Sequence, residues 1–333
     1  MIKELYDYSL LAHNTFGIDV RCRRFIEYAT VQQLQQLIPS LVHPFLHIGG
    51  GSNLLFSADY PGTVLHSAIR GIEKVCESGS QVLVKVGAGE VWDDFVQWAV
   101  SEGLGGVENL SLIPGEVGAS AVQNIGAYGV EAKDVIVKVD AVDLTSGHLR
   151  QFDNAQCNYS YRQSIFKNEL KGRFAVTHVT FALSIHPQLR LDYGNIRSVL
   201  GDREDVTVAD VRRAIIDIRN AKLPDPARLG NAGSFFMNPI VDEATFQRIL
   251  ATYPDMPFYP VGSRYKIPAG WMIEQCGWKG RALGRAGAHD KQALVLVNLG
   301  GATSGDIIRL SDSIRKDVME RFGVDIHPEV NVI

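Results

Sequence analysis

Two glycine-rich segments constrain this chain most, because each one interrupts short apolar runs at a point where the backbone has to turn sharply. The first segment, Gly49-Gly-Gly-Ser-Asn53, lies between the apolar runs 45–48 and 54–56. Glycine adopts positive φ and lets the main chain approach an anion closely, so the N–H groups of this segment could cradle a phosphate. A plain tight turn would have the same residues. Leu54 stands at the last glycine position of G-x-G-x-x-G, and no G-K-[ST] follows, so neither the Rossmann fingerprint nor the P-loop is present.

The second segment, 113–129, contains four glycines, and its residues after position 116 are uncharged. Small side chains let a flat ligand approach the backbone, and Ser120, Gln123 and Asn124 offer the neutral hydrogen-bond partners that a buried heterocycle needs. A close-packed turn region would have the same composition. Neither segment opens a long helical pattern, so together they predict a large dinucleotide that is held mainly by loops.

Composition limits the class of protein and its partners. The 333 residues suffice for about two domains of ~150 residues, with 46% hydrophobic and 21% charged residues, as in globular proteins. Lys and Arg number 33 against 37 Asp and Glu, which gives a net charge of -4. This balance provides no general attraction for nucleic acid or for an anionic membrane, so any phosphate-bearing partner has to be bound at a local site.

Cysteine and histidine spacing indicates neither a disulfide framework nor a metal site. Cys22, Cys76, Cys157 and Cys276 form no C-x-x-C pair, and the nine histidines form no H-x-x-H or H-E-x-x-H motif. The N-terminal residues do not resemble a secretory signal, and the longest uncharged stretch, 28–58, is too polar to span a bilayer. We therefore expect a cytoplasmic protein.

Apolar periodicity predicts a mixed α+β protein. We expect strands at 45–48, 54–56, 82–86, 135–144 with a bulge, 179–185, 293–297 and 323–333. We expect helices at 92–99, 211–218, 246–253 and 307–318. Thr207 and Asp210 resemble a capping box before the second of these helices, and Leu223-Pro-Asp-Pro226 ends it, so we place a domain boundary there.

Three polar residues have apolar or aromatic neighbours in the sequence, which makes them candidates for a functional role. Arg162 lies among aromatic and apolar neighbours, where burial requires an anionic partner, unless it forms a surface ion pair. Ser234 directly precedes two phenylalanines in a small-residue turn without the G-x-S-x-G pattern, and a turn or cap serine is the alternative. Glu329 is a carboxylate in an apolar terminal strand, so its charge or proton needs a partner unless the residue is exposed.

Nine short motifs, taken in order, resemble the UDP-N-acetylenolpyruvoylglucosamine reductase family (MurB). Each is weak alone, but their joint order and spacing over almost the whole chain are specific. The motifs are Asn14-Thr-Phe-Gly17, Gly49-Gly-Gly-Ser-Asn53, Ile113-Pro-Gly115, Gln123-Asn-Ile-Gly-Ala-Tyr-Gly129, Tyr161-Arg162-x-Ser164, Lys222-Leu-Pro-Asp-Pro226, Gly230-Asn-Ala-Gly-Ser-Phe-Phe236, Ala269-Gly-Trp271 and Pro328-Glu-Val330. Asp192-Tyr-Gly194 resembles the substrate-covering tyrosine loop of the larger, type I subgroup.

The resemblance implies an FAD-binding fold of the vanillyl-alcohol-oxidase (PCMH) type with two lobes, followed by a C-terminal α+β substrate-binding domain. Lobe 1 would comprise residues 1–70 and 322–333, lobe 2 residues 71–223, and the substrate-binding domain residues 224–321. It also implies a monomeric, cytoplasmic enzyme of bacterial peptidoglycan synthesis. Such an enzyme binds FAD non-covalently, uses NADPH as cosubstrate and UDP-N-acetylglucosamine enolpyruvate as substrate, and binds neither nucleic acid nor membrane.

The same resemblance implies roles for single residues. Arg162 would stabilise negative charge on the substrate after hydride transfer, Ser234 would donate a proton to carbon, and Glu329 would complete the polar network. The residues implied for FAD are Gly49, Gly50, Gly51, Ser52, Asn53, Ile113, Pro114, Gly115, Gly118, Ser120, Gln123, Asn124, Ile125, Gly126, Tyr128 and Val176. Those implied for the UDP-sugar are Tyr193, Lys222, Asn238, Tyr259 and Gln292. No metal is implied.

Two alternatives stay open at this point. An FAD oxidase of the same fold would act on an alcohol or sugar, reoxidise rapidly in air with release of hydrogen peroxide, and show no preference for NADPH. A non-catalytic protein that binds a nucleotide sugar on a flavin scaffold would be colourless. Failure to take up FAD would count against both enzymes.

Overall fold

The computed structural model describes residues 2–333, which form two compact units. Unit 1 comprises the chain up to Tyr8, Arg21–Gly50 and Tyr60–Ala221, and unit 2 comprises Ser9–Val20, Gly51–Asp59 and Lys222–Ile333. The boundaries expected at residues 70, 223 and 321 stay a prediction. We describe each unit separately.

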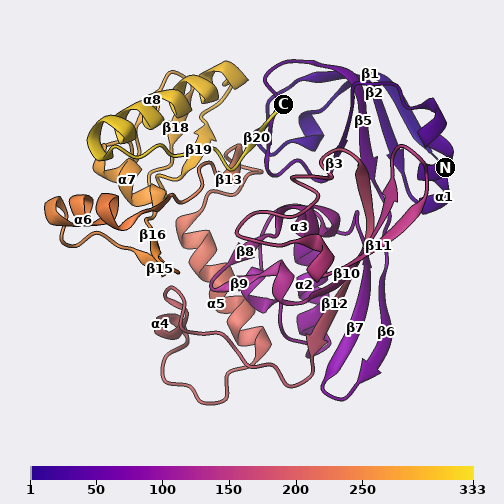
Figure 1. Cartoon of the computed structure of the whole chain (residues 1–333), viewed down its shortest axis with the longest axis horizontal. Coiled ribbons are helices and arrows are strands. Elements are labelled where there is room, and N and C mark those ends of the chain that lie inside the picture. Colours follow the sequence, from indigo (N-terminus) through magenta and orange to yellow (C-terminus); the bar gives the residue numbers. More distant parts are fainter. Residues whose placement is uncertain (1) are drawn as a thin grey trace. The chain divides into compact units, whose positions relative to one another are not determined.

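Unit 1 contains two main sheets. The first has the strand order β1-β2-β5-β3, with β5 parallel to both β2 and β3, and the second is antiparallel with the order β11-β10-β12-β7-β6 (Figure 1). The strands are β1 Lys3–Ser9, β2 Arg21–Tyr28, β3 Phe45–Ile48, β5 Tyr60–Ser67, β6 Ile72–Ser78, β7 Gln81–Gly87, β8 Gly126–Ala127, β9 Val130–Glu131, β10 Ile136–Asp143, β11 Leu149–Asp153 and β12 Phe174–Ser184. The helices are α1 Val31–Leu37, α2 Trp92–Ser101, α3 Val117–Gln123, α4 Ile196–Leu200 and α5 Val208–Lys222.

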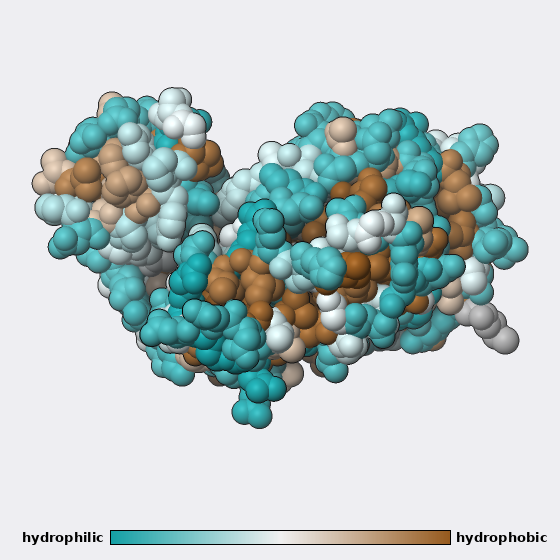
Figure 2. Space-filling model, turned by 90° about the horizontal axis from the view of Figure 1, so that it is seen from below, coloured by the Kyte–Doolittle hydropathy of each residue, from teal (hydrophilic) through white to brown (hydrophobic). Residues whose placement is uncertain are grey.

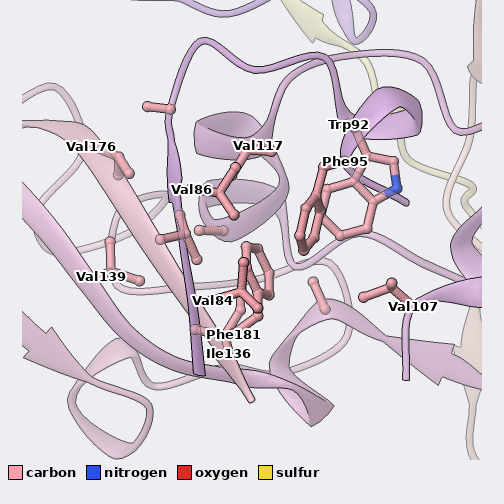
Figure 3. Close-up of a cluster of buried hydrophobic side chains, with 14 of the residues drawn as sticks. Val84, Val86, Trp92, Phe95, Val107, Val117, Ile136, Val139, Val176 and Phe181 are labelled. Carbon is pink, nitrogen blue, oxygen red and sulfur yellow. The ribbon is translucent and has the colours of Figure 1, made fainter. Parts of the chain in front are cut away.

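In a large hydrophobic core of unit 1, β7 buries the apolar residues at every second position and α2 buries the apolar residues of one face. Val84 and Val86 alternate on β7, while Trp92 and Phe95 lie on one face of α2, and all four are buried. The ring of Phe181 on β12 lies 4.7 Å from that of Phe95 and 5.9 Å from that of Trp92. Figure 3 shows these side chains pointing toward one another. The predicted strand at 82–86 and the predicted helix from Trp92 are confirmed.

The predicted bulged hairpin is also confirmed. The pairing of β10 with β12 shifts register twice, between Ile136 and Lys138 and between Asp140 and Ala141. After β10, the side chain of Asp143 accepts hydrogen bonds from the next turn, which leads into β11. The shift of apolar parity in the sequence therefore corresponds to a real irregularity in the ladder.

One helix appears where the sequence analysis expected mainly loop. α3 occupies residues Val117–Gln123 within the second glycine segment. It ends at Asn124, whose φ of 46° is left-handed. The seven residues of this helix are mostly small and too few to show an apolar stripe, so periodicity could not reveal it.

Unit 2 consists of short strands, three α-helices and a short 3-10 helix at Leu11–His13. Its sheets have the orders β13-β19-β18-β17 and β14-β16-β15, and β20 pairs in parallel with β4. The strands are β4 Leu54–Leu55, β13 Asn231–Ser234, β14 Ile240–Val241, β15 Tyr259–Val261, β16 Arg264–Lys266, β17 Ala282–Leu283, β18 Ala286–Ala288, β19 Val295–Asn298 and β20 Asn331–Val332. The helices are α6 Glu243–Thr252, α7 Ala269–Gln275 and α8 Ser304–Phe322.

The C-terminal segment only partly follows its predicted pattern. α8 ends at Gly323, which has a left-handed φ of 63°, as the sequence predicts. The strand expected over 323–333 is restricted to β20, at Asn331–Val332. Val324 and Ile326 are buried as in a strand but pair with no other strand among the described residues, and Pro328 has no N–H to donate.

Within residues 2–333, no helix has the length and apolar content to cross a bilayer. Figure 2 shows hydrophobic residues in patches among a largely hydrophilic surface on the face that it presents. Exposed apolar residues of this kind are normal in globular proteins.

We expect Phe181→Ala to lower the free energy of unfolding by about 3–5 kcal/mol, because the buried ring would leave a cavity beside Phe95 and Trp92. Val137 on β10 is 37% exposed and provides the control. Val137→Ala should cost less than about 1 kcal/mol. Urea unfolding followed by circular dichroism measures both values, and equal losses would contradict this account of the core.

Candidate functional site

The first glycine segment begins where β3 ends in unit 1. β3 pairs with β5, so that Ile48 lies opposite His66. Gly49 and Gly50 follow and are partly exposed, and within residues 2–333 their N–H groups donate to no acceptor. Unpaired N–H groups on glycines at the end of a strand are suited to an anion.

The second glycine segment lies against the first. A Cβ atom at Gly50 would lie 3.5 Å from the Cα atom of Gly115. Gly118 in turn donates its N–H to the carbonyl of Ala88 at 2.8 Å, and a Cβ at Gly118 would lie 2.8 Å from the Cβ of Ala88. The structure therefore brings together the two segments that the sequence analysis singled out.

Several residues implied for FAD have structural partners of their own. Ser120 is buried and donates to the carbonyl of Val117 at 2.7 Å. Asn124 is fully buried, donates to the carbonyl of Ser160 at 2.9 Å and accepts from a backbone N–H at 3.0 Å. Val176 is buried in the core of unit 1. These side chains hold the scaffold in place, and their contact with a cofactor stays a prediction.

The rest of the first glycine segment belongs to unit 2. A Cβ atom at Gly51 would lie 1.9 Å from the carbonyl oxygen of His13, so no other residue fits there. The side chain of Asn53 donates to the carbonyl of Glu329 at 3.2 Å, and the N–H of Asn331 donates to the carbonyl of Asn53 at 3.1 Å. This half of the segment is therefore fastened beside Glu329.

Arg162 lies against the second glycine segment within unit 1. Its Nη2 donates to the carbonyl of Gly126 at 2.7 Å, and its guanidinium lies 5.3 Å from the ring centroid of Tyr161. The backbone of Arg162 has a φ of 58°, which is uncommon for a residue with a side chain. Lys167 donates to the carbonyl of Arg162 at 3.1 Å and holds this unusual turn in place.

Ser234 and Glu329 come close together within unit 2, although 95 positions separate them in the sequence. Ser234 is the last residue of β13 and is exposed, while Phe235 after it is buried. The N–H of Glu329 donates to the carbonyl of Phe235 at 2.8 Å, and Phe236 forms a bridge with Pro328. The C-terminal segment thus runs alongside the residues that follow Ser234.

The residues implied for the UDP-sugar lie in both units. Tyr193 in unit 1 is 43% exposed, and its Cβ lies 3.3 Å from where a Cβ at Gly129 would be. Lys222, the last residue of α5, opens the main segment of unit 2.

The other three residues implied for the UDP-sugar belong to unit 2. Asn238 accepts a hydrogen bond from the N–H of Ala269 at 2.9 Å and so orients the start of α7. Tyr259 is 43% exposed, and the Lys266 ammonium lies 5.5 Å from its ring centroid. Gln292 lies beside α7, near Gly270. Tyr259 therefore presents a ring and a hydroxyl at the surface of this unit.

Comparison with known proteins decides the family. Residues 24–153 match the family described as FAD binding domain, and residues 225–333 match the C-terminal domain of UDP-N-acetylenolpyruvoylglucosamine reductase. The reductase of Bacteroides fragilis (strain ATCC 25285) is 59% identical, over 98% of this chain and 99% of the relative. The chain belongs to the UDP-N-acetylenolpyruvoylglucosamine reductase family.

A second relative agrees with this assignment, and a solved structure agrees with the fold. The reductase of Burkholderia ambifaria is 47% identical, over 98% of this chain and 95% of the relative. The crystal structure of the reductase from Thermus caldophilus is 22% identical and superposes with a TM-score of 0.69, covering 100% of this chain and 98% of that one. The expected α+β fold, with an FAD-binding part and a C-terminal domain, is confirmed.

The residues present in unit 1 fit the FAD that a reductase of this family uses. Gly49 and Gly50 offer unpaired N–H groups, and the backbone beside them is lined by Gly115 instead of a side chain. A dinucleotide needs both features, because its phosphates accept from backbone N–H groups and its rings need room close to the main chain.

The sequence analysis missed a buried cation on α5. The guanidinium of Arg219 is buried, and its Nε has no hydrogen-bond partner among residues 2–333. Burial lowers the pKa of Arg219 and raises the pKa of the neighbouring Tyr128. An unsatisfied buried donor marks a place where an acceptor is missing from the protein. The sequence of α5 contains several arginines, and its periodicity does not show that Arg219 is the one with a buried guanidinium.

The sequence analysis also missed a cluster of three ionisable residues in unit 1, namely Glu27, His66 and Glu116. His66 lies with Nδ1 2.9 Å from Oε2 of Glu27 and with Nε2 2.9 Å from Oε1 of Glu116. His66 and Glu116 are both buried. The one signal in the sequence is that Glu116 is the only charged residue of the segment 113–129.

We expect Gly51→Ala to abolish FAD retention, because its Cβ would lie 1.9 Å from the carbonyl oxygen of His13 and the loop would have to move. Gly17 is the matched control, because its φ of 64° is close to the 66° of Gly51. A Cβ at Gly17 would meet no other atom within 4 Å. Gly17→Ala should cost only the backbone strain of about 1–2 kcal/mol.

Visible flavin absorbance of the purified proteins and urea unfolding measure the two effects of these alanine substitutions. Equal flavin content in both variants would show that the close approach at Gly51 is unimportant for the cofactor.

Proposed function

We propose that this chain catalyses the NADPH-dependent reduction of UDP-N-acetylglucosamine enolpyruvate to UDP-N-acetylmuramate, a step of peptidoglycan synthesis. The observation that carries the proposal is the 59% identity with the Bacteroides fragilis reductase over 98% of the chain. The glycine segments of unit 1 support it, because they offer the backbone donors and the small residues that FAD requires.

FAD, when bound, accepts a hydride from NADPH and delivers it to the terminal vinyl carbon of the enolpyruvyl group. The chain itself has to hold the cofactor, stabilise charge and supply a proton. Residues 49–53 and the second glycine segment would hold FAD, and the N–H groups of Gly49 and Gly50 would offer donors to its diphosphate. Val176 supports this scaffold from the core.

Arg162 stabilises the negative charge of the reaction. Hydride addition to the vinyl carbon leaves an enolate-like charge on the adjoining carbon and the carboxylate of the substrate. A guanidinium carries its positive charge at every relevant pH and binds carboxylates through two donors. The hydrogen bond to Gly126 and the unusual backbone of Arg162 support this role, because they hold the guanidinium in one orientation.

Ser234 donates the proton that completes the reduction, and Glu329 assists. A serine hydroxyl is a weak acid, so it matches only a strongly basic carbanion and has to regain its proton through neighbours. The proximity of the main chain of Glu329 to that of Phe235 supports a joint role of the acid and the serine. Glu329 acts in protonated or hydrogen-bonded form, because a bare carboxylate would repel the intermediate.

Tyr193, Lys222, Asn238, Tyr259 and Gln292 bind the UDP-sugar. Lys222 neutralises the diphosphate as a point charge, and the exposed hydroxyls of Tyr193 and Tyr259 add hydrogen bonds. We extend the proposal to a cytoplasmic monomer that binds neither nucleic acid nor membrane, in keeping with the net charge of -4. Light scattering during size-exclusion chromatography tests the monomer.

The reaction itself is tested by the absorbance of NADPH in the presence and absence of UDP-N-acetylglucosamine enolpyruvate. Oxidation of NADPH that depends on this substrate, with one equivalent of UDP-N-acetylmuramate formed, is the expected result. Oxidation that depends on oxygen instead, with release of hydrogen peroxide, would assign the chain to the oxidase alternative.

We expect Ser234→Ala to keep FAD and to be reduced by NADPH at the normal rate. Its reoxidation by the enolpyruvyl substrate should slow by about 10²–10⁴-fold, the usual contribution of a positioned acid. Ser313→Ala on α8 is the control, because Ser313 is partly exposed and its hydroxyl donates to the carbonyl of Arg309 at 2.8 Å, within the same helix. Stopped-flow flavin absorbance separates the two half-reactions, and unchanged reoxidation would remove Ser234 from this role.

Two substitutions of Glu329 distinguish positioning from proton transfer. We expect Glu329→Gln to keep more of the reoxidation rate than Glu329→Ala, because an amide preserves hydrogen bonds that alanine lacks. The same stopped-flow measurement compares them. Equal losses would indicate that the transferable proton of Glu329 matters more than its hydrogen bonds.

A further inference from the structure

The cluster of Glu27, His66 and Glu116 lies outside the catalytic set and at a critical place in unit 1. Strand β5 lies between β2 and β3, and its parallel pairing places His66 opposite Glu27 on one side and Ile48 on the other. Ile48 is the residue before Gly49. His66 is therefore fixed at the point where β3 runs into the first glycine segment.

Glu116 connects His66 to both glycine segments. It stands directly after Gly115 and points back toward the first segment. A Cβ at Gly49 would lie 3.3 Å from Oε2 of Glu116, and a Cβ at Gly50 would lie 3.8 Å from Oε1. The buried carboxylate thus lies alongside the two residues whose N–H groups have no protein acceptor.

The charges of this cluster bear on any anion bound there. Two buried or half-buried carboxylates next to a phosphate would weaken its binding unless a cation offsets them. Burial alone would lower the pKa of His66, but the hydrogen bonds and charges of Glu116 and Glu27 outweigh burial and raise it.

Two further ionisable groups near His66, on the neighbouring strands β3 and β2, are neutral at physiological pH. His47 on β3 is buried, which together with the charge of His66 lowers its pKa to about 4. The hydroxyl of Tyr28 on β2 lies 2.6 Å from Nε2 of His47, and burial raises the pKa of Tyr28. His66 is therefore the single cation that faces Glu27 and Glu116 among these groups.

We propose that Glu27, His66 and Glu116 form a positioning triad for the diphosphate of FAD. The cationic imidazole, held between the two carboxylates, keeps Glu116 against Gly49 and Gly50 and offsets its charge, so that the N–H groups of both glycines face the phosphates. This inference rests on the FAD binding that the proposed function requires. It assigns the triad to cofactor binding, and none of the three residues touches the reacting atoms.

The consequence is a defined pH dependence of FAD affinity. A bound diphosphate raises the pKa of His66 further, so binding takes up protons. Affinity should therefore be highest when His66 is protonated. It should fall over the pH range above the ordinary pKa of histidine, as the pH rises through the raised pKa of His66. The diphosphate itself keeps its charge over this range.

The experiment titrates flavin-free protein with FAD and follows the flavin fluorescence across this pH range. We expect His66→Gln to bind FAD at least about tenfold more weakly at low pH, the cost of a lost charged hydrogen bond, and to lose the pH dependence. Glu116→Gln should keep most of the affinity and shift the pH dependence to lower pH. The double variant should regain most of the affinity that His66→Gln loses, since no buried carboxylate of Glu116 remains to be offset.

The control is Asp143→Asn, which removes another buried carboxylate of unit 1, paired with Arg173 at 3.0 Å. It should lower the urea midpoint but leave FAD affinity and its pH dependence unchanged. Wild-type affinity in His66→Gln, a double variant as weak as His66→Gln, or an unchanged pH dependence in Glu116→Gln would each overturn the triad. Wild-type protein that binds no FAD at all would instead overturn the proposed function.

Discussion

The turn at residues 13–17 is the constraint on which the arrangement of unit 2 depends. Asn14 is buried and donates to the carbonyls of Leu10 and Ile18 at 2.8 and 2.9 Å, so that the turn has one shape. The carbonyls of this turn then meet two glycines that come from distant parts of the chain. A Cβ would lie 1.9 Å from one carbonyl at Gly51 and 2.2 Å from another at Gly230. Within unit 2, this turn therefore positions both Gly51 and the start of β13, at whose end Ser234 stands.

In unit 1, charged side chains lie near the unpaired N–H groups of Gly49 and Gly50 but do not occupy them. Arg162 is held by the carbonyl of Gly126, and Glu116 is held by His66. Each charged side chain is tied to a partner beside a glycine segment, so the unpaired N–H groups of that region stay available. Buried charges are costly unless they are paired in this way.

Much of the fold could be predicted because local periodicity agreed with burial. The alternation of 82–86, the stripe of α2, the parity shift in β10 and the ends of α5 and α8 all follow from residues close in sequence. α3 was not predicted because its seven residues are mostly small and too few to show an apolar stripe. The predicted terminal strand was longer than the observed one. Val324 and Ile326 are buried at alternate positions, as in a strand, but they take part in no strand pairing within the described residues.

The sequence by itself determined the family and the two glycine segments, because each depends on short motifs in a specific order. The roles of single residues that follow from the same motifs stay proposals. The tertiary structure alone decided that Gly50 lies against Gly115, that Glu329 runs beside Phe235, and that His66 lies between Glu27 and Glu116. These contacts join residues far apart in the chain, and only strand pairing and close packing bring such residues together. No periodicity in the sequence encodes which carboxylate a buried histidine will meet.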